Sequence, residues 1–267
     1  MPKLALIIFI KVPIPGLVKT RLSQTTCLDD VDVTLLAEAM FKDTLVAASE
    51  SIADVIEIGF FPKNEFSRIK KIVDLVRIAE NLLKPINYSV QTGINFDERF
   101  SSIVRNSFEK KDDIIVILGA DLPYLHMSAI NTAFNSLDAN QNKKRVVLGP
   151  AGGGGVYLVG ITKEFSPKWF VEYELFRGGV EISQFVKLCE KENFELEMLH
   201  PLIDIDIEED LVSLLAFIDT KDVVKHYYEF HFPKYTAQAV KTLGLYIKDK
   251  TGETRKRKIG KRKENLF

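Results

Sequence analysis

The sequence predicts a three-layer α/β protein, in which a mainly parallel sheet lies between two layers of helices. The first observation is a set of short aliphatic runs, such as residues 114–118. That run follows a polar stretch and ends at Gly119, as a strand buried on both faces does. The second observation is that segments with apolar residues at helical spacing separate these runs. Strands that alternate with helices are typical of parallel sheets.

The patterns predict each element in turn. Strands are expected at residues 4–10, 52–61, 88–91, 114–118, 145–150, from 156 onward and at 195–199. Helices are expected at 31–49, 65–84, 95–109, 128–137 and 181–193, with one more that includes or starts at Asp210. Asn95 is placed to cap the third of these helices.

Composition is that of an ordinary globular protein: 46% of the 267 residues are apolar and 27% are charged. Cys27 and Cys189 show neither a zinc-site spacing nor a disulfide framework, so we expect a cytoplasmic protein. The apolar run at 4–10 is too short to span a membrane and lacks the cleavage site of a leader peptide.

We expect three parts: a main domain over residues 1–218, an aromatic-rich helical appendage over 219–247 and a basic flexible tail over 248–267. The tail holds nine Lys or Arg against three Asp or Glu, whereas the whole chain has a net charge of −1. A solvated terminus explains such a tail more simply than contact with nucleic acid or a membrane surface. The appendage is expected to pack on the domain or on a second subunit, which leaves a homo-oligomer open.

Asp121 stands just beyond the predicted strand at 114–118. In open α/β sheets, ligands bind beyond the carboxyl ends of the strands. Pro123 fixes the turn that follows. A carboxylate held there is placed to bind a divalent metal ion that carries phosphates. The alternative is that Asp121 only caps the next helix.

Residues 11–22 follow the first predicted strand and contain two prolines and a glycine, so we expect an irregular loop. The loop carries the cations of Lys11, Lys19 and Arg21 and the hydroxyl of Thr20. Arginine offers a planar fork for phosphate and lysine a point charge. The segment therefore predicts an anion-binding loop at the carboxyl edge of the sheet, with a solvated basic loop as the alternative.

Four consecutive glycines follow the predicted strand at 145–150. They are Gly152, Gly153, Gly154 and Gly155. Backbone without side chains can lie directly against a substrate, although the Gly-Lys-Ser/Thr ending of a P-loop is absent. A floppy surface loop is the alternative. Arg177 stands beside a second, paired glycine motif at 178–179.

Asp204 and Asp206 precede a predicted helix. In extended backbone their side chains point the same way, and with no lysine nearby in the sequence they repel unless a cation lies between them. Acids before a helix also serve as caps, and that interpretation suits Glu208, Glu209 and Asp210.

Four motifs occur in a fixed order along the chain: Lys11-x-Pro-x-Pro-Gly-x-x-Lys-Thr-Arg-Leu, Gly119-Ala-Asp-Leu-Pro, Gly149-Pro with Gly154-Gly and Leu158-x-Gly, and Asp204-x-Asp-x-x-Glu-Asp-Leu. Over residues 4–216 the chain therefore resembles the GT-A-type transferases associated with radical-SAM proteins, and the related 2-phospho-L-lactate guanylyltransferases. It departs from the first family at Gly153, where an Asp is usual. It departs from the second at Val156-Tyr157, where Thr-Asn is typical.

The resemblance implies a fold of the nucleotide-diphospho-sugar transferase (GT-A-like) type. It implies a metal-dependent nucleotidyltransferase that moves a nucleoside monophosphate from a nucleoside triphosphate, with GTP favoured, to a small phosphorylated acceptor such as 2-phospholactate. Two alternatives remain open. One is a glycosyltransferase that uses an NDP-sugar, and the other is a nucleotide-binding module without turnover, which Gly153 favours.

The resemblance also assigns roles to the residues singled out above. Asp121 with Asp204 or Asp206 is expected to hold Mg²⁺ or Mn²⁺. Lys19 and Arg21 are expected to hold the triphosphate and, with Asp121, to form the catalytic set. The expected substrate-binding residues are Lys11, Thr20, Gly152, Gly153, Gly154, Gly155 and Arg177.

Overall fold

The computed structural model describes residues 1–139, 144–226, 230–249 and 257–262, and its main sheet has the strand order β3-β2-β1-β4-β6-β5-β7. The strands are β1 Leu4–Lys11, β2 Val55–Phe61, β3 Ile86–Val90, β4 Ile114–Gly119, β5 Arg145–Pro150, β6 Val156–Thr162 and β7 Glu195–Met198. Only β6 runs antiparallel to its neighbours β4 and β5 in this sheet, so the predicted mainly parallel sheet is confirmed.

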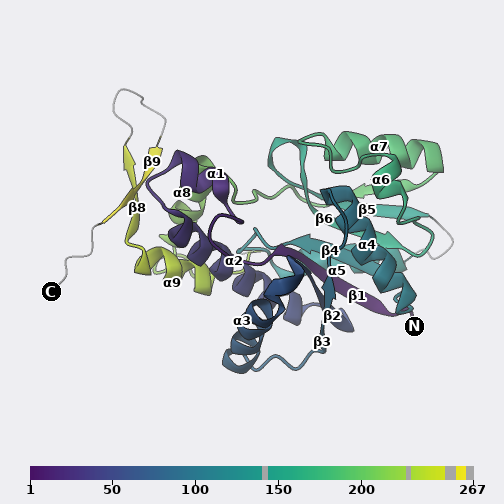
Figure 1. Ribbon diagram of the computed structural model, residues 1–267, viewed down its shortest axis with the longest axis horizontal. Coiled ribbons are helices and arrows are strands. Elements are labelled where there is room, and N and C mark those ends of the chain that lie inside the picture. The colour runs from purple at the N-terminus through teal and green to yellow at the C-terminus, as the bar shows by residue number, and fades with distance from the viewer. Residues whose placement is uncertain (140–143, 227–229, 250–256, 263–267) are drawn as a thin grey trace.

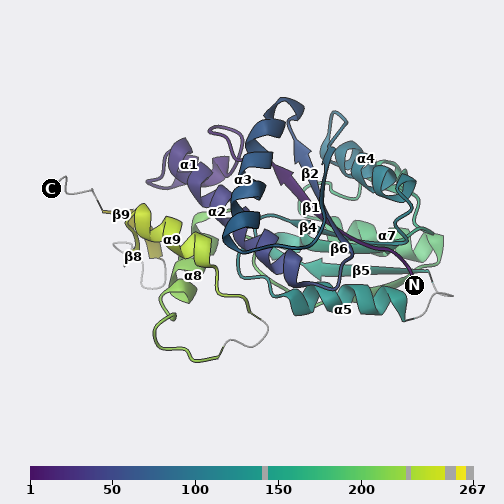
Figure 2. The same cartoon turned by 90° about the horizontal axis from the view of Figure 1, so that it is seen from below.

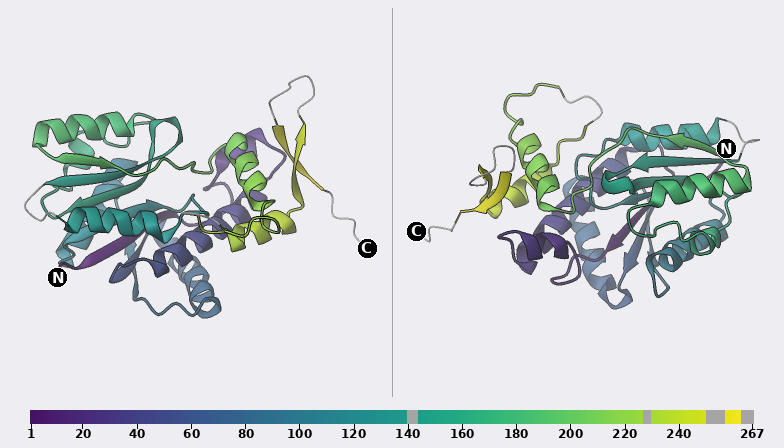
Figure 3. Two further views of the ribbon diagram at one scale, coloured as in Figure 1. Left: turned by 180° about the vertical axis from the view of Figure 1, so that it is seen from behind. Right: turned by 90° about the horizontal axis from the view of Figure 1, so that it is seen from above.

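Helices cover both faces of this sheet, as the sequence predicts (Figures 1 and 2). The described helices are α1 Thr20–Thr25, α2 Asp30–Glu50, α3 Phe66–Ala79, α4 Phe96–Glu109, α5 Met127–Asp138, α6 Trp169–Glu172, α7 Glu181–Glu192, α8 Glu208–Ile218 and α9 Lys234–Thr242. Of these, α1, α8 and α9 lie to one side of the sheet (Figure 1). Figure 3 shows the sheet between α7 on one side and α5 on the other. Among the described helices, none is both long and apolar enough to cross a membrane.

Alternation along β1 builds the two cores. Ile7 belongs to the core that α4, α6 and α7 complete with Phe100, Phe170 and Phe185. Its neighbour Ile8 belongs to the core on the opposite face, which α2, α3 and α5 complete. Successive side chains of a strand point to opposite faces, so a strand buried on both sides must be apolar throughout.

Local signals place the helix α4 correctly and several boundaries less well. The Asn95 side chain caps α4 by accepting a hydrogen bond from the Glu98 N–H at 2.9 Å. The strand β2 begins three residues later than expected, and α3 ends at Ala79 instead of at residue 84. The segment 11–22 is only partly a loop, because α1 begins at Thr20.

The C-terminal segment differs from the expected flexible tail. Strands β8 Leu245–Asp249 and β9 Arg257–Lys261 form an antiparallel hairpin beside α8 (Figure 1). Ile259 is buried in a third core that α1, α2, α8 and α9 share. The Lys261 ammonium lies 2.6 Å from a carboxylate oxygen of Asp32. The expectation of a flexible tail is therefore wrong for residues 248–249 and 257–261. The burial of Ile259, the hydrogen bond from its N–H to Glu208 at 2.9 Å and the ion pair of Lys261 dock them on the domain.

The expected helical appendage over 219–247 is helical only in part among the described residues. In the described part of 219–247, the helix present is α9, which packs on α2. Its first turn is held by the buried Asp43 carboxylate, which accepts hydrogen bonds from the N–H groups of Tyr235 and Thr236. Tyr227 and Tyr228, two of the aromatic residues of the expected appendage, lie outside the described residues.

Candidate active site

A cleft of about 480 Å³ opens at the carboxyl edge of the sheet, and we call it the main cleft. Segments that follow β1 and β4, together with the segment before α8, line it. The structure thus brings together most of the side chains singled out from the sequence: Lys11, Lys19, Thr20, Arg21, Asp121, Asp204 and Asp206.

Backbone hydrogen bonds join the two acidic segments of the main cleft. The Ile205 N–H, which lies between the two aspartates of its segment, donates to the Asp121 carbonyl at 3.1 Å. The Tyr124 hydroxyl accepts from the Ile203 N–H at 3.0 Å. These contacts hold Asp204 and Asp121 at one place, although more than eighty residues separate them in the sequence.

Lys19 lies between the acidic side chains. Its Nζ is 2.8 Å from Asp121 Oδ2 and 3.8 Å from Asp206 Oδ1, and its side chain is only 4% exposed. Asp206 has no lysine nearby in the sequence, but the fold brings Lys19 to it, so the expectation that the Asp204/Asp206 pair lies far from any lysine is wrong. The Lys19 backbone is left-handed, with φ 50°, an uncommon conformation for a residue other than glycine.

Arg21 extends the same charge network toward solvent. It lies on α1, and its Nη1 is 2.6 Å from Asp206 Oδ2. Its side chain is 72% exposed, so the guanidinium can leave this contact at little cost. Two of the cations in the main cleft, the buried Lys19 and the exposed Arg21, are therefore each paired with a carboxylate.

The Asp204 carboxylate lies deeper in the site. Burial raises its pKa, the Lys19 ammonium lowers it, and the negative charge of Asp121 raises it. The three aspartates supply oxygen donors only, the type that Mg²⁺ prefers. Within the described residues, no group of three His, Cys, Asp or Glu has the arrangement of a ready metal site. The donor set fits an ion held by one or two carboxylates together with substrate phosphates, which is a usual mode for Mg²⁺.

The glycine run approaches the site at Asp204, but none of its four glycines lines the main cleft, and only Gly155 lines the pocket beside it. Residues 152–154 form a short 3₁₀ turn, and a Cβ on Gly152 would lie 3.6 Å from Asp204 Oδ1. Gly154 has φ 87°, and a Cβ there would lie 2.8 Å from the Gly179 carbonyl oxygen, so this position requires glycine. At Gly153 nothing lies within 4 Å of such a Cβ.

Arg177 does not join the other predicted residues. Its guanidinium pairs with the Glu174 carboxylate, its side chain is 71% exposed, and it lines neither the main cleft nor the pocket beside it. The expectation that Arg177 binds substrate is not supported by this placement.

The architecture matches solved structures over most of their length. A protein from Desulfovibrio desulfuricans G20, described only provisionally as a nucleotide-diphospho-sugar transferase, superposes with a TM-score of 0.68 at 23% identity, over 91% of this chain and 98% of that chain. The fold is of the nucleotide-diphospho-sugar transferase type. A 4-diphosphocytidyl-2C-methyl-D-erythritol synthase from Anaerococcus prevotii matches this GT-A-like fold with a TM-score of 0.53 at 12% identity, over 82% of this chain and 99% of that chain.

Further comparisons are consistent with the same fold. A cytidylyltransferase from Leptospira borgpetersenii has a TM-score of 0.50 at 13% identity, over 91% of this chain and 95% of that chain. The family model DUF2064, described as an uncharacterized protein conserved in bacteria, matches residues 71–178. No curated protein matches the sequence. At these identities the solved structures establish the GT-A-like fold alone.

Two residues of the main cleft were missed in the sequence. Gln91 Nε2 donates to the carbonyls of Ile10 at 3.0 Å and Gly59 at 2.7 Å, which ties the ends of β1 and β2 together. The Arg99 guanidinium stacks over the Phe61 ring, with 3.9 Å from its carbon to the ring centroid. Both follow β3 toward the carboxyl edge, so the rule that located Asp121 could also have indicated them.

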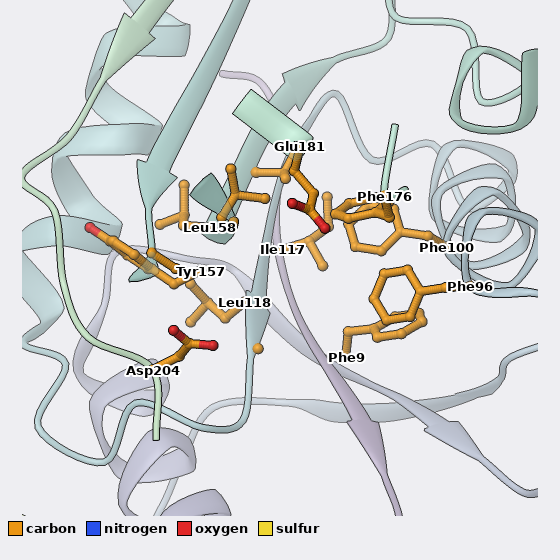
Figure 4. A pocket seen from close by; sticks show the side chains of 15 residues that line it. Phe9, Phe96, Phe100, Ile117, Leu118, Tyr157, Leu158, Phe176, Glu181 and Asp204 are labelled. Atoms are coloured by element: carbon orange, nitrogen blue, oxygen red, sulfur yellow. The ribbon is translucent and has the colours of Figure 1, made fainter. Parts of the chain in front are cut away.

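A second pocket, of about 240 Å³, adjoins the main cleft, and we call it the side pocket. Asp204 and Tyr157 line both cavities, so the two are continuous. Figure 4 shows a group of phenylalanine rings on one side of the side pocket, with Glu181 and Asp204 reaching in from different elements. Glu181 gave no signal in the sequence, since a glutamate at the start of a helix is common for reasons unrelated to ligands.

Proposed function

We propose that this protein is a metal-dependent nucleotidyltransferase. It moves a nucleoside monophosphate from a nucleoside triphosphate, with GTP favoured, to a small phosphorylated acceptor. The observation that carries the proposal is the convergence of Lys19, Asp121 and Asp204 in one cleft at the carboxyl edge of a GT-A-like sheet. A cleft with both cations and carboxylates suits a substrate that combines phosphates with a divalent ion.

The transfer itself requires little covalent chemistry from the protein. A phosphate oxygen of the acceptor forms a bond to the α-phosphorus of the nucleotide. The bond from that phosphorus to the oxygen bridging to the β-phosphorus breaks, and pyrophosphate leaves with the electron pair. Lys19 and Arg21 bind the triphosphate and balance its charge, and the glycine run admits the acceptor beside Asp204. Positioning and charge neutralisation then provide most of the rate.

Asp121 and Asp204 would hold the Mg²⁺ ion, with Asp206 oriented by Arg21 next to them. When bound, the ion supplies Lewis-acid stabilisation of the phosphate oxygens. The Lys19 ammonium lies in the cleft at 2.8 Å from Asp121. A bound nucleotide would therefore offer it phosphate oxygens as further partners. In the free protein, Lys19 and Arg21 pair with the aspartates. In the complex, the two cations would pair with the phosphates and the aspartates with the ion.

A second candidate is glycosyl transfer from an NDP-sugar, favoured by the description of the Desulfovibrio protein. The names of the Anaerococcus and Leptospira proteins favour nucleotidyl transfer, with cytidine nucleotides as a further choice of donor. The two activities release different products, pyrophosphate in one case and a nucleoside diphosphate in the other. Product analysis therefore separates them.

The test is a reaction of the protein with Mg²⁺ and GTP or CTP labelled at the α-phosphorus, with 2-phospholactate or O-phosphoethanolamine as acceptor. We expect pyrophosphate release together with label in a new nucleotide-linked product, both abolished in Asp121→Asn. A parallel reaction with UDP-glucose or GDP-mannose tests glycosyl transfer through release of UDP or GDP. Free nucleoside diphosphate from the sugar donors, with no pyrophosphate from any triphosphate, would contradict the proposal. Tight nucleotide binding without any product would instead support a binding module.

A further inference from the structure

The side pocket has a charge opposite to that of the main cleft. In the described part of the chain, the residues that line it include no Lys, Arg or His, but they include Glu181 and Asp204 with their carboxylates. The main cleft, by contrast, is lined by four basic side chains: Lys11, Lys19, Arg21 and Arg99. A triphosphate therefore belongs in the main cleft. The side pocket disfavours a second anionic group on whatever enters it.

One carboxylate oxygen of Glu181 lacks a hydrogen-bond donor among the described residues. Glu181 is the first residue of α7, and its Oε1 accepts a hydrogen bond from the Gly179 N–H at 3.2 Å. Its other oxygen, Oε2, is buried and has no hydrogen-bond partner among the described residues. A buried carboxylate oxygen without a donor is costly, and a bound ligand can supply the donor.

Neighbouring groups add to the negative potential around Glu181. The Asp97 carboxylate accepts a hydrogen bond from the Phe176 N–H at 2.9 Å. Burial raises the pKa of Asp97, and the negative charges of Glu174 and Glu181 raise it as well. Among the residues that the structure describes, Glu174 pairs with the exposed Arg177, and no cation pairs with Asp97 or Glu181. A positively charged donor therefore suits this end of the side pocket better than a neutral one.

An aromatic wall forms one side of the pocket. Ring centroids lie 5.1 Å apart for Phe9 and Phe96, 4.9 Å for Phe96 and Phe176, and 4.5 Å for Phe100 and Phe176 (Figure 4). Such rings bury alkyl groups and also attract cations through their faces. At about 240 Å³ the pocket is smaller than the sites of drug-sized ligands, so its occupant is small.

We infer that the side pocket is the acceptor subsite and that the acceptor is an aminoalkyl phosphate or phosphonate. Its ammonium donates to Glu181 Oε2, its short alkyl chain lies against the phenylalanine wall, and its phosphate points out of the side pocket toward the Lys19 ammonium in the main cleft. This inference rests on the proposed function and names its acceptor class. It replaces 2-phospholactate, whose second charged group is a carboxylate that Glu181 repels.

The test separates this inference from the nucleotide site. The protein is first titrated with the α,β-methylene analogues of GTP and CTP in Mg²⁺, and the loaded protein is then titrated with O-phosphoethanolamine, 3-aminopropyl phosphate and 2-phospholactate. We expect both amines to bind and 2-phospholactate to bind at least roughly tenfold more weakly, as one lost charged contact implies. Failure of the analogues to bind overturns the proposed function. Binding of an analogue, followed by failure of both amines to bind, overturns only the acceptor class.

A substitution in α7 provides the second arm. Glu181→Gln keeps the shape but removes the charge, so it should weaken amine binding roughly ten- to a hundredfold while leaving nucleotide affinity unchanged. The matched control is Glu190→Gln, which alters an exposed glutamate of the same helix. An unchanged amine affinity in Glu181→Gln, or preference of the parent protein for 2-phospholactate, contradicts the inference.

Discussion

Replacing Lys19 with methionine is the perturbation that most sharply separates binding from folding. Methionine keeps most of the volume of a side chain that is 4% exposed, but it removes the ammonium 2.8 Å from Asp121. A lost charge-assisted contact is worth about 1.5–3 kcal/mol, so nucleotide affinity should fall roughly ten- to 150-fold. Asp121 and Asp206 are about 45% and 36% exposed, so solvent screens their repulsion, and the free energy of unfolding should change by only about 1 kcal/mol.

Isothermal titration calorimetry with Mg²⁺ and each of the four nucleoside triphosphates measures the affinity, and urea unfolding measures the stability. The control is Lys163→Met, which removes the same charge from an exposed lysine that pairs with Asp113 at the opposite edge of the sheet. Equal nucleotide affinity in Lys19→Met and in the control would refute the assignment of Lys19 to the triphosphate.

Three further predictions concern stability. Burial raises the pKa of Asp43 to about 6, so its contribution to folding is complete below about pH 4 and is lost as the pH rises through 6. In urea unfolding, the free energy of unfolding of the parent protein should fall by about 3 kcal/mol more than that of Asp43→Asn as the pH rises from about 4 to above 6. The same pH dependence in both proteins would show that Asp43 ionises freely. Ile259→Ala should lower the free energy of unfolding by about 2–5 kcal/mol, whereas a change below about 0.5 kcal/mol would mean that β9 does not dock. Gly149→Ala should lower the free energy of unfolding by about 1–3 kcal/mol in the same assay, because its Cβ would lie 2.4 Å from the Tyr157 ring. The control is Gly119→Ala, whose Cβ would have no atom within 4 Å. Equal stability of the two variants would contradict the close contact at Gly149.

The sheet could be predicted because its central strands are buried on both faces. A strand such as β4 must then be a continuous aliphatic run, and that pattern is visible without knowledge of its neighbours. The position of Asp121 follows from the same run, since residues just beyond a parallel strand lie at the ligand-binding edge. The antiparallel direction of β6 is set by its pairing with β4 and β5, and no local pattern encodes it.

The contacts that decide the chemistry could not be predicted from local patterns. Lys19 meets Asp121 and Asp206 only after α1 and the segment before α8 are placed, across more than a hundred residues of sequence. The lack of a hydrogen-bond donor at Glu181 Oε2 depends on which residues of the fold bury this oxygen. In β9 a single apolar residue, Ile259, stands among basic residues, so its burial leaves almost no periodic signal.

The central claim is that the main cleft binds a nucleoside triphosphate together with a divalent ion held by Asp121. Calorimetric titration of the four triphosphates into the parent protein and into Asp121→Asn, each with Mg²⁺ and again with EDTA, tests this claim most directly. We predict saturable binding to the parent protein that weakens at least roughly tenfold in EDTA or in Asp121→Asn. No binding of any triphosphate, or equal binding in all four combinations of protein and buffer, would contradict the claim.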